Sequence, residues 1–263
     1  MNVLPLKMLE LMIALVTLLP LTSARLDSLK TVDDYLNICL DGRNHKSAPG
    51  PENELLTQYC KPWAKRSCCS SKVVKDIDTS SSWLNFNWDH CQQLSPQCRE
   101  QFLMDLCFYE CSPNVGPWLQ QDTRKIRKER FRDVPLCQPV CDRWWDACNN
   151  DFTCTDNWAA GFNWSTGINT CPEGNKCRPF HQVYSGANNF CETVMGNSFK
   201  VVPETEDCFY TWFSPNEPNP NEPVARKKAA QLLGIGYSEN SSEVNAVSWQ
   251  SFVFLILGAV IFC

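Results

Sequence analysis

Cysteines constrain the fold of this chain more than any other residue type. The 263-residue sequence contains 17 of them, and all but Cys263 lie between Cys39 and Cys208. In a secreted protein an even number of cysteines indicates a disulfide framework, here of eight bridges, although spacing alone does not give the pairing. Each bridge restricts the unfolded chain and stabilises the fold by about 2 to 4 kcal/mol. We therefore expect a disulfide-stabilised domain, although few long segments show apolar periodicity.

Residues 1–24 are typical of a secretory signal peptide. Lys7 precedes a largely apolar run at 11–21, and the small residues Thr-Ser-Ala at 22–24 suit signal peptidase. The secretory route oxidises thiols, which supports the disulfide interpretation.

Zinc is the competing interpretation of the paired cysteines. Cys107 and Cys111 are separated by three residues, as are Cys137 and Cys141. However, the chain has only three histidines, His45, His90 and His181, and an oxidising compartment disfavours thiolate ligands. We predict no metal site.

The C-terminal end has the order of segments that directs attachment of a glycosylphosphatidylinositol (GPI) anchor. Residues 252–263 are apolar, but 12 residues are too few for the roughly 20 that a membrane-spanning helix needs. The small-residue site Asn240-Ser241-Ser242 lies upstream, within a polar stalk that we place at 236–251. We predict that the tail 252–263 is removed on anchoring. Asn240 also begins an N-glycosylation sequon, as does Asn163.

The remaining residues, 25–235, are predicted to form one domain of ordinary size. The clearest helix spans 95–110, because Ser95 suits an N-cap, Pro96 suits the first helical position, and apolar residues follow at helical spacing. We predict further helices at 136–149 and 225–233 and a helical stretch at 52–59. Residues 154–184 are expected to be loops and short extended pieces, and 213–223 a proline-rich loop.

The chemistry of the chain favours binding over catalysis. It contains no GxSxG elbow, no HExxH, no phosphate-binding glycine loop and no dinucleotide fingerprint, and we predict no enzyme activity. A net charge of -5 argues against nucleic acid as a partner.

A candidate ligand pocket lies around the first predicted helix. Asp105 and Tyr109 are four residues apart and share one face of that helix. Arg127 and Arg130 are three residues apart in the following basic segment, which a disulfide framework could fold back against Asp105. We expect the carboxylate and the two arginines to form one site; a buried ion pair without a ligand is the alternative.

Several motifs resemble the folate receptor family, which also includes riboflavin-binding proteins and a Juno-type branch that acts in sperm adhesion at the egg surface. The similar segments include CFYECSPNVGPW, RKERFRDVPLC, DRWWDAC, NPNEPVAR and the opening LNICLDGRNHKSAPGPE. The resemblance covers about residues 35 to 230 and implies a compact, disulfide-rich α+β domain of short helices and strands. The disulfide pairing that it implies is Cys39 with Cys68, Cys60 with Cys107, Cys69 with Cys111, Cys91 with Cys177, Cys98 with Cys148, Cys137 with Cys208, Cys141 with Cys191, and Cys154 with Cys171.

The resemblance also implies a set of ligand-binding residues. In folate receptors an aspartate on the long helix and two arginines hold the pterin, and the matching positions are Asp105, Arg127 and Arg130. A carboxylate can accept from the 2-amino group of a pterin, and a guanidinium can donate to its 4-oxo group. The corresponding edge of a flavin has no amino group, so Asp105 favours a pterin. Ser198 matches a serine that contacts the ligand, and the aromatic residues at matching positions are Phe86, Tyr109, Trp158, Phe162 and Trp164.

The sequence departs from the folate receptor pattern at several of these positions. Ile126 and Met195 replace tryptophans, and Leu84 replaces a tyrosine. Ala159 and Ala160 replace the His-Lys pair that meets the glutamate tail of folate. We therefore expect an intact pterin end and a weaker tail end.

The resemblance predicts a GPI-anchored cell-surface receptor that binds folic acid and reduced folates and internalises them by endocytosis, without a cofactor. One alternative is a Juno-type adhesion receptor with a protein partner on another cell, in which the pocket is vestigial. The second is a riboflavin-binding protein.

Overall fold

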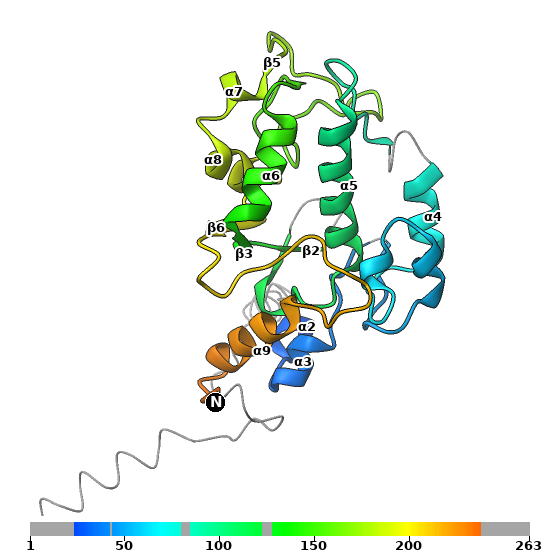
Figure 1. The fold of residues 1–263 in the computed structure, drawn as a ribbon, viewed down its shortest axis with the longest axis vertical. Helices are drawn as coiled ribbons and strands as arrows, with labels where there is room; N and C mark the ends of the chain where they lie inside the picture. The colour runs from blue at the N-terminus through cyan, green and yellow to red at the C-terminus, as the bar shows by residue number, and fades with distance from the viewer. Residues whose placement is uncertain (1–23, 43, 80–84, 123–127, 238–263) are drawn as a thin grey trace, which may run out of the picture.

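The computed structural model describes residues 24–42, 44–79, 85–122 and 128–237. The predicted signal peptide, except Ala24, and Leu84, Ile126, Arg127, Asn240 and the C-terminal tail lie outside these residues. Helix α5 (Pro96–Cys111) stands at the centre of the molecule, with α6 (Gln138–Cys148) packed beside it and α4 (Ser71–Thr79) on the other side (Figure 1). Helices α3 (Val32–Leu36) and α9 (Asn221–Leu232) pack against each other at one end.

The structure confirms the helix predicted after Ser95. The Ser95 side chain accepts a hydrogen bond from the Cys98 amide (3.3 Å), so it caps the helix, and Pro96 occupies the first turn. Ser95 Oγ also donates to Asp151 Oδ2 (2.6 Å), which joins the start of α5 to the segment after α6. The helix ends at Cys111, before Ser112 and Pro113.

Eight disulfides connect the described residues, and each is a pair that the family resemblance implies. The Cys98–Cys148 bridge joins the first turn of α5 to the last turn of α6. Cys60–Cys107 and Cys69–Cys111 join the other end of α5 to the N-terminal segment. Helix α5 is therefore held at both ends. The remaining bridges are Cys39–Cys68, Cys91–Cys177, Cys137–Cys208, Cys141–Cys191 and Cys154–Cys171.

The strands are short and form three separate two-stranded sheets among the described residues, so the α+β class is confirmed. Strands β1 (Leu119–Gln121) and β2 (Glu129–Phe131) are antiparallel. Strands β3 (Val134–Cys137) and β6 (Phe199–Val202) are parallel, with Val134 opposite Phe199. Strands β4 (Phe152–Thr153) and β5 (Arg178–Pro179) are antiparallel.

Two predicted helices differ in extent or type. Helix α9 begins at Asn221, four residues earlier than expected, because a proline in the first turn of a helix needs no amide donor and Pro223 is tolerated there. The stretch predicted at 52–59 contains the 3₁₀ helix η1 (Asn53–Thr57). The other described helices are α2 (Ala24–Asp27), η2 (Lys61–Trp63), η4 (Gly116–Trp118), α7 (Phe180–Val183) and α8 (Ala187–Thr193).

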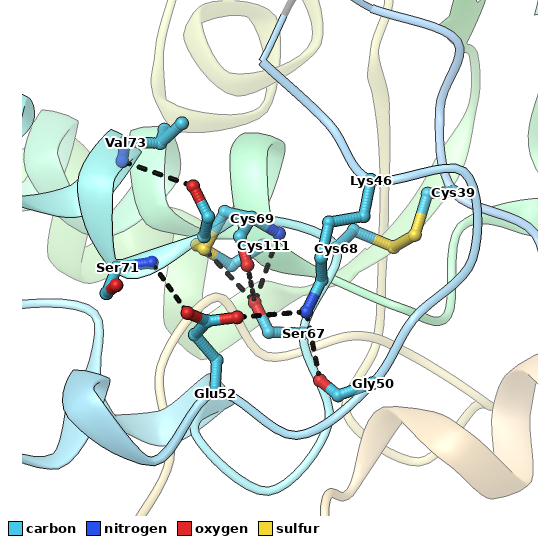
Figure 2. A network of polar contacts seen from close by, with 11 residues as sticks. Cys39, Lys46, Gly50, Glu52, Ser67, Cys68, Cys69, Ser71, Val73 and Cys111 are labelled. Atoms are coloured by element: carbon cyan, nitrogen blue, oxygen red, sulfur yellow. Dashed lines mark hydrogen bonds and ion pairs between the residues drawn. A yellow bond between two sulfur atoms is a disulfide. The ribbon is translucent and has the colours of Figure 1, made fainter.

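A polar network supports the N-terminal segment where it meets α5 (Figure 2). Glu52 accepts from the Ser71 amide (3.0 Å) and forms an ion pair with Lys46 (3.2 Å), and the Ser71 amide is the main cause of a lowered pKa of Glu52. Ser67, beside it, donates to the carbonyl of Cys69 (3.0 Å), which is bridged to Cys111. The network therefore fixes the loop to which the last turn of α5 is bonded.

The core is rich in aromatic side chains. Phe102 of α5 stacks on Trp158 with ring centroids 4.4 Å apart and planes 3° from parallel, and it meets Trp144 of α6 edge to face. Phe102 and Trp144 are almost fully buried. In the part of the chain that the structure describes, no helix has the length and apolar character to cross a bilayer.

Candidate ligand-binding site

Asp105 lies in the middle of α5, on the same face as Phe102 and Tyr109. Only 5 % of its surface is exposed, and no donor or cation among the described residues pairs with its carboxylate. Burial therefore raises the pKa of Asp105 to about 7. Buried polar groups are normally hydrogen-bonded, so this carboxylate calls for a partner that the described residues do not supply.

Four aromatic residues predicted at the site form one cluster beside Asp105. Phe86 is at its centre, with ring centroids 5.7 Å from Trp158, 5.6 Å from Phe162 and 6.2 Å from Trp164. Trp158 and Phe162 are buried, whereas Trp164 is 41 % exposed. The cluster thus extends from the core to the surface, and its buried end stacks on Phe102, one turn from Asp105.

Tyr109 lies one turn after Asp105 along α5, whereas Phe102, on which Trp158 stacks, lies one turn before it. Its ring packs on Phe131 of β2 with centroids 5.6 Å apart, and His45 meets it edge to face at 5.5 Å. A ring nitrogen of His45 also lies 3.1 Å from the Tyr109 carbonyl oxygen. Along the helix, Asp105 therefore lies between the Phe102–Trp158 stack on one side and Tyr109, packed on Phe131, on the other.

Arg130 is held by backbone carbonyls. It donates to the carbonyl oxygens of Gly196 and Met195 just beyond α8, and Ser198 Oγ donates to the same Met195 oxygen (2.7 Å). Gly196 has a φ of +63°, and a Cβ placed there would lie 3.1 Å from Ala159 and 3.4 Å from the Arg130 guanidinium. The backbone conformation at Gly196 thus places Arg130, Ala159 and Ser198 in one neighbourhood.

The described site residues form two groups beside α5, which are the aromatic cluster around Phe86 and the pair Arg130 and Ser198 at Met195 and Gly196. Tyr109 contacts Phe131, the residue after Arg130, and Ala159, the residue after Trp158, lies beside Gly196. Asp105 and Arg130 form no ion pair in this structure, so a direct bridge between these two does not account for the burial of Asp105. Arg127 is outside the described residues.

Two supporting residues, Thr153 and Asn157, were not predicted from the sequence. Thr153 Oγ1 accepts from the indole N–H of Trp158 (2.9 Å) and lies 3.1 Å from a ring nitrogen of His90. Asn157 Oδ1 accepts from the amides of Ala159 (3.0 Å) and Ala160 (3.1 Å). An asparagine side chain often accepts from amides two or three residues further on, so the sequence could have indicated the role of Asn157. Nothing in the sequence indicates the contact between Thr153 and Trp158.

Metal-ligating atoms also come together in the described part of the chain. The groups are His90 with Cys91 and Cys154, Cys91 with Cys171 and Cys177, and Cys98 with Cys148 and Asp151. Every cysteine in them is in a disulfide, and the thiolate is the form that binds metals. These groups therefore do not offer a cysteine-based metal site while the bridges are intact.

The predicted glycosylation residue Asn163 is exposed, as a modified asparagine must be. Its side-chain oxygen accepts from the Ser165 amide (2.9 Å), and its backbone pairs with Thr170 across a short turn. Trp164 is the middle residue of the sequon, so a glycan on Asn163 would lie next to the exposed end of the aromatic cluster.

The buried carboxylate makes stability depend on pH. The pKa of Asp105, about 7 in the folded protein against the usual 3.8, means that the folded state keeps a proton that the unfolded chain releases. The resulting penalty is absent below about pH 4, grows as pH rises and is complete above about pH 7. We expect Asp105→Asn to raise the free energy of unfolding relative to wild type by an amount that increases over this window to at most about 4 kcal/mol.

Denaturant unfolding with the disulfides intact, at several pH values between 4 and 7.5, measures this difference. The exposed residue Asp76 provides the control, because Asp76→Asn should give a profile parallel to that of wild type. Parallel profiles for Asp105→Asn and wild type would mean that the carboxylate has a charged or hydrogen-bonding partner in the folded protein.

Comparison with known proteins is consistent with this geometry. The sequence profile of the folate receptor family matches residues 38–210. The chain is 42 % identical over 226 residues to folate receptor gamma of Homo sapiens, covering 84 % of this chain and 91 % of the relative. It is 40 % identical over 207 residues to human folate receptor alpha, covering 77 % and 80 %, and 34 % identical over 165 residues to riboflavin-binding protein of Gallus gallus, covering 62 % and 66 %. The chain, with its eight bridges and its central helix, belongs to the folate receptor family.

Proposed function

We propose that this protein is a cell-surface receptor that binds folates through a pterin ring held at Asp105. The observation on which the proposal rests is the carboxylate itself, which is buried on a rigid helix without a partner among the described residues. A ligand that brings N–H donors to this point would remove the cost of that burial. The names of the relatives, folate receptors alpha and gamma, support the same ligand class.

The aromatic cluster fits the remainder of a folate. A flat ring needs aromatic surfaces on its sides and a few polar groups at its edge. Phe86, Trp158, Phe162 and Trp164 offer such surfaces in one cluster, which extends from Phe102 of α5 to the exposed ring of Trp164. Tyr109 and Ser198 complete the proposed contact set, with Arg130 as the described guanidinium.

A pterin suits Asp105 better than a flavin. The pterin edge presents an amino group beside a carbonyl, whereas the flavin edge presents acceptor, donor, acceptor and would place oxygen lone pairs against the carboxylate. The relationship to riboflavin-binding protein makes the flavin a real alternative, but that relative matches a smaller part of this chain than the folate receptors do.

The proposed contacts at the far end of the ligand are apolar. Ala159 and Ala160 stand in a turn organised by Asn157, and neither can pair with the carboxylates of a glutamate tail. We infer that the ring and benzoyl portions supply most of the affinity. Removal of the glutamate tail from the ligand should therefore weaken binding less here than at a site where cations meet the tail.

Substitution of Asp105 tests the proposed site directly. Asp105→Ala removes the acceptor of the ligand amino group, so we expect folate binding to weaken by about 2 to 5 kcal/mol, whereas Asp105→Asn restores one acceptor and should lose less. The measurement is titration of the purified ectodomain with folic acid, 5-methyltetrahydrofolate and riboflavin, followed by tryptophan fluorescence or calorimetry. Asp76→Asn is the control for an exposed aspartate.

The outcomes separate the candidate functions. Unchanged folate affinity in correctly secreted Asp105→Ala protein would place the ligand elsewhere. Absence of folate binding in wild type, together with binding to a protein on another cell, would favour the Juno-type adhesion role. Preferential binding of riboflavin would favour the flavin alternative.

Acid should weaken folate binding. The free carboxyl of Asp105 has a pKa of about 7, and contact with ligand N–H groups should lower it in the complex, so ligand binding releases a proton below neutral pH. We expect nearly constant affinity above pH 7 and a loss of up to about tenfold per pH unit as pH falls toward the pKa of the complex. Titrations at pH 7.5, 6.5 and 5.5 measure this slope, which Asp105→Asn should flatten; equal slopes would assign the acid response to another group. Release at endosomal pH would serve the endocytic uptake that we propose.

We also propose that a GPI lipid holds the receptor to the outer leaflet of the plasma membrane. If so, phospholipase C specific for phosphatidylinositol should release it from intact cells, because no other membrane attachment would remain after removal of the tail. Flow cytometry before and after enzyme treatment gives the fraction released. Detection of residues 252–263 by mass spectrometry in a protein that the active enzyme does not release would contradict the anchor.

A further inference from the structure

Two disulfides lie in contact with each other next to the aromatic cluster. They are Cys91–Cys177 and Cys154–Cys171. The sulfur of Cys171 lies 3.9 Å from that of Cys91 and 3.9 Å from that of Cys177, although it is bonded to neither. A sulfur released from one bridge is therefore already beside a sulfur of the other.

Cys177 is the most solvent-exposed residue of these two bridges. Among the sixteen cysteines that the structure describes, Cys177 is the exposed one, Cys91 and Cys171 are half-buried, and the others are buried. Thiol–disulfide exchange depends on access of the attacking thiolate to a sulfur. An external thiol can therefore attack this framework at Cys177 far more easily than at the six buried bridges.

A histidine lies beside the two sulfurs that such an attack would release. A ring nitrogen of His90 and the sulfurs of Cys91 and Cys154 all lie within 4.8 Å of one another. The ring is oriented by Thr153 Oγ1 (3.1 Å) and the Asn87 carbonyl (3.3 Å), and burial lowers the pKa of His90 while both bridges are closed. An imidazole that takes the proton of a neighbouring thiol becomes an imidazolium, and this ion pair favours the thiolate, which is the reactive form.

We propose that these four cysteines and His90 form a thiol–disulfide exchange centre that opens in response to an external low-molecular-weight thiol. The thiolate attacks Cys177 Sγ and forms a mixed disulfide, while the Cys91–Cys177 bond breaks and its electron pair leaves on Cys91. The Cys91 thiolate then attacks Cys171, the Cys91–Cys171 bond forms, and Cys154 leaves as a thiolate that takes a proton. A second thiol attacks the mixed disulfide at Cys177, so two external thiols are oxidised to one disulfide and the protein gains two thiols.

The exchange would alter the segment that contains most of the aromatic cluster. Cys154–Cys171 closes a loop of sequence separation 17 that includes Trp158, Phe162 and Trp164. Transfer of Cys171 to Cys91 removes that closure and leaves the other six bridges in place. To the extent that the proposed folate site is correct, the product should bind folate less tightly than the starting protein.

Disulfide mapping tests the exchange without reference to any ligand. The glycosylated ectodomain would be treated with reduced glutathione at neutral pH, quenched by alkylation at intervals, and digested for mass spectrometry. We expect glutathione at Cys177, a Cys91–Cys171 cross-linked peptide and alkylated Cys154 to appear before any of the six buried bridges opens. Opening of another bridge first, or thiols at Cys91 and Cys177 with Cys154–Cys171 intact, would overturn the proposal.

Two variants separate the chemistry from simple unfolding. His90→Gln should slow formation of the Cys91–Cys171 bond by about threefold to tenfold, because without the imidazole a smaller fraction of Cys91 is present as the attacking thiolate. His181→Gln, at an exposed histidine outside the cluster, is the matched control and should leave the rate unchanged. Equal rates in His90→Gln and wild type would remove His90 from the centre. The cross-linked peptide alone decides whether exchange occurs, and folate affinity of the product separately tests its effect on the proposed site.

Discussion

The rest of the structure depends on the covalent fixation of α5. Bridges at Cys98, Cys107 and Cys111 connect this one helix to α6 and to the N-terminal segment. Burial that raises the pKa of Asp105 to about 7 costs at most about 4 kcal/mol at neutral pH, whereas each disulfide contributes about 2 to 4 kcal/mol. A domain held by eight bridges can therefore keep Asp105 in a position where its charge is poorly solvated. A ligand that donates hydrogen bonds to the carboxylate would remove this cost, and the free energy regained would add to its affinity.

The surroundings of Asp105 are also fixed before any ligand binds. Trp158 is held by stacking on Phe102 and by its hydrogen bond to Thr153, and Arg130 is held by the carbonyls of Met195 and Gly196. Side chains that are already ordered lose little conformational entropy on binding.

Different parts of this architecture were predictable from the sequence to different degrees. The capping signal of Ser95 and Pro96 and the regular apolar spacing gave α5 nearly to the residue, because these are local effects. The start of α9 was misplaced, since Pro223 is compatible with a first turn as well as with a loop. The number of bridges followed from cysteine parity, but their pairing came only from the family resemblance, because spacing does not encode which sulfurs meet. The anchoring of Arg130 depends on a left-handed backbone at Gly196, 66 residues away, and no local pattern indicates that contact.

The distribution of the bridges divides the site into a fixed part and an adjustable part. The three bridges at α5 are fully buried, so the helix that holds Asp105 is protected from exchange. The loop that holds Trp158, Phe162 and Trp164 is closed by Cys154–Cys171, whose neighbour Cys177 is open to solvent. Asp105, the polar contact proposed to select the ligand, thus lies on the helix held by buried bridges. The aromatic surfaces proposed to enclose the ligand lie on the loop whose bridge is open to thiol–disulfide exchange. The exchange that we propose would therefore alter the aromatic surfaces and leave Asp105 and its helix in place.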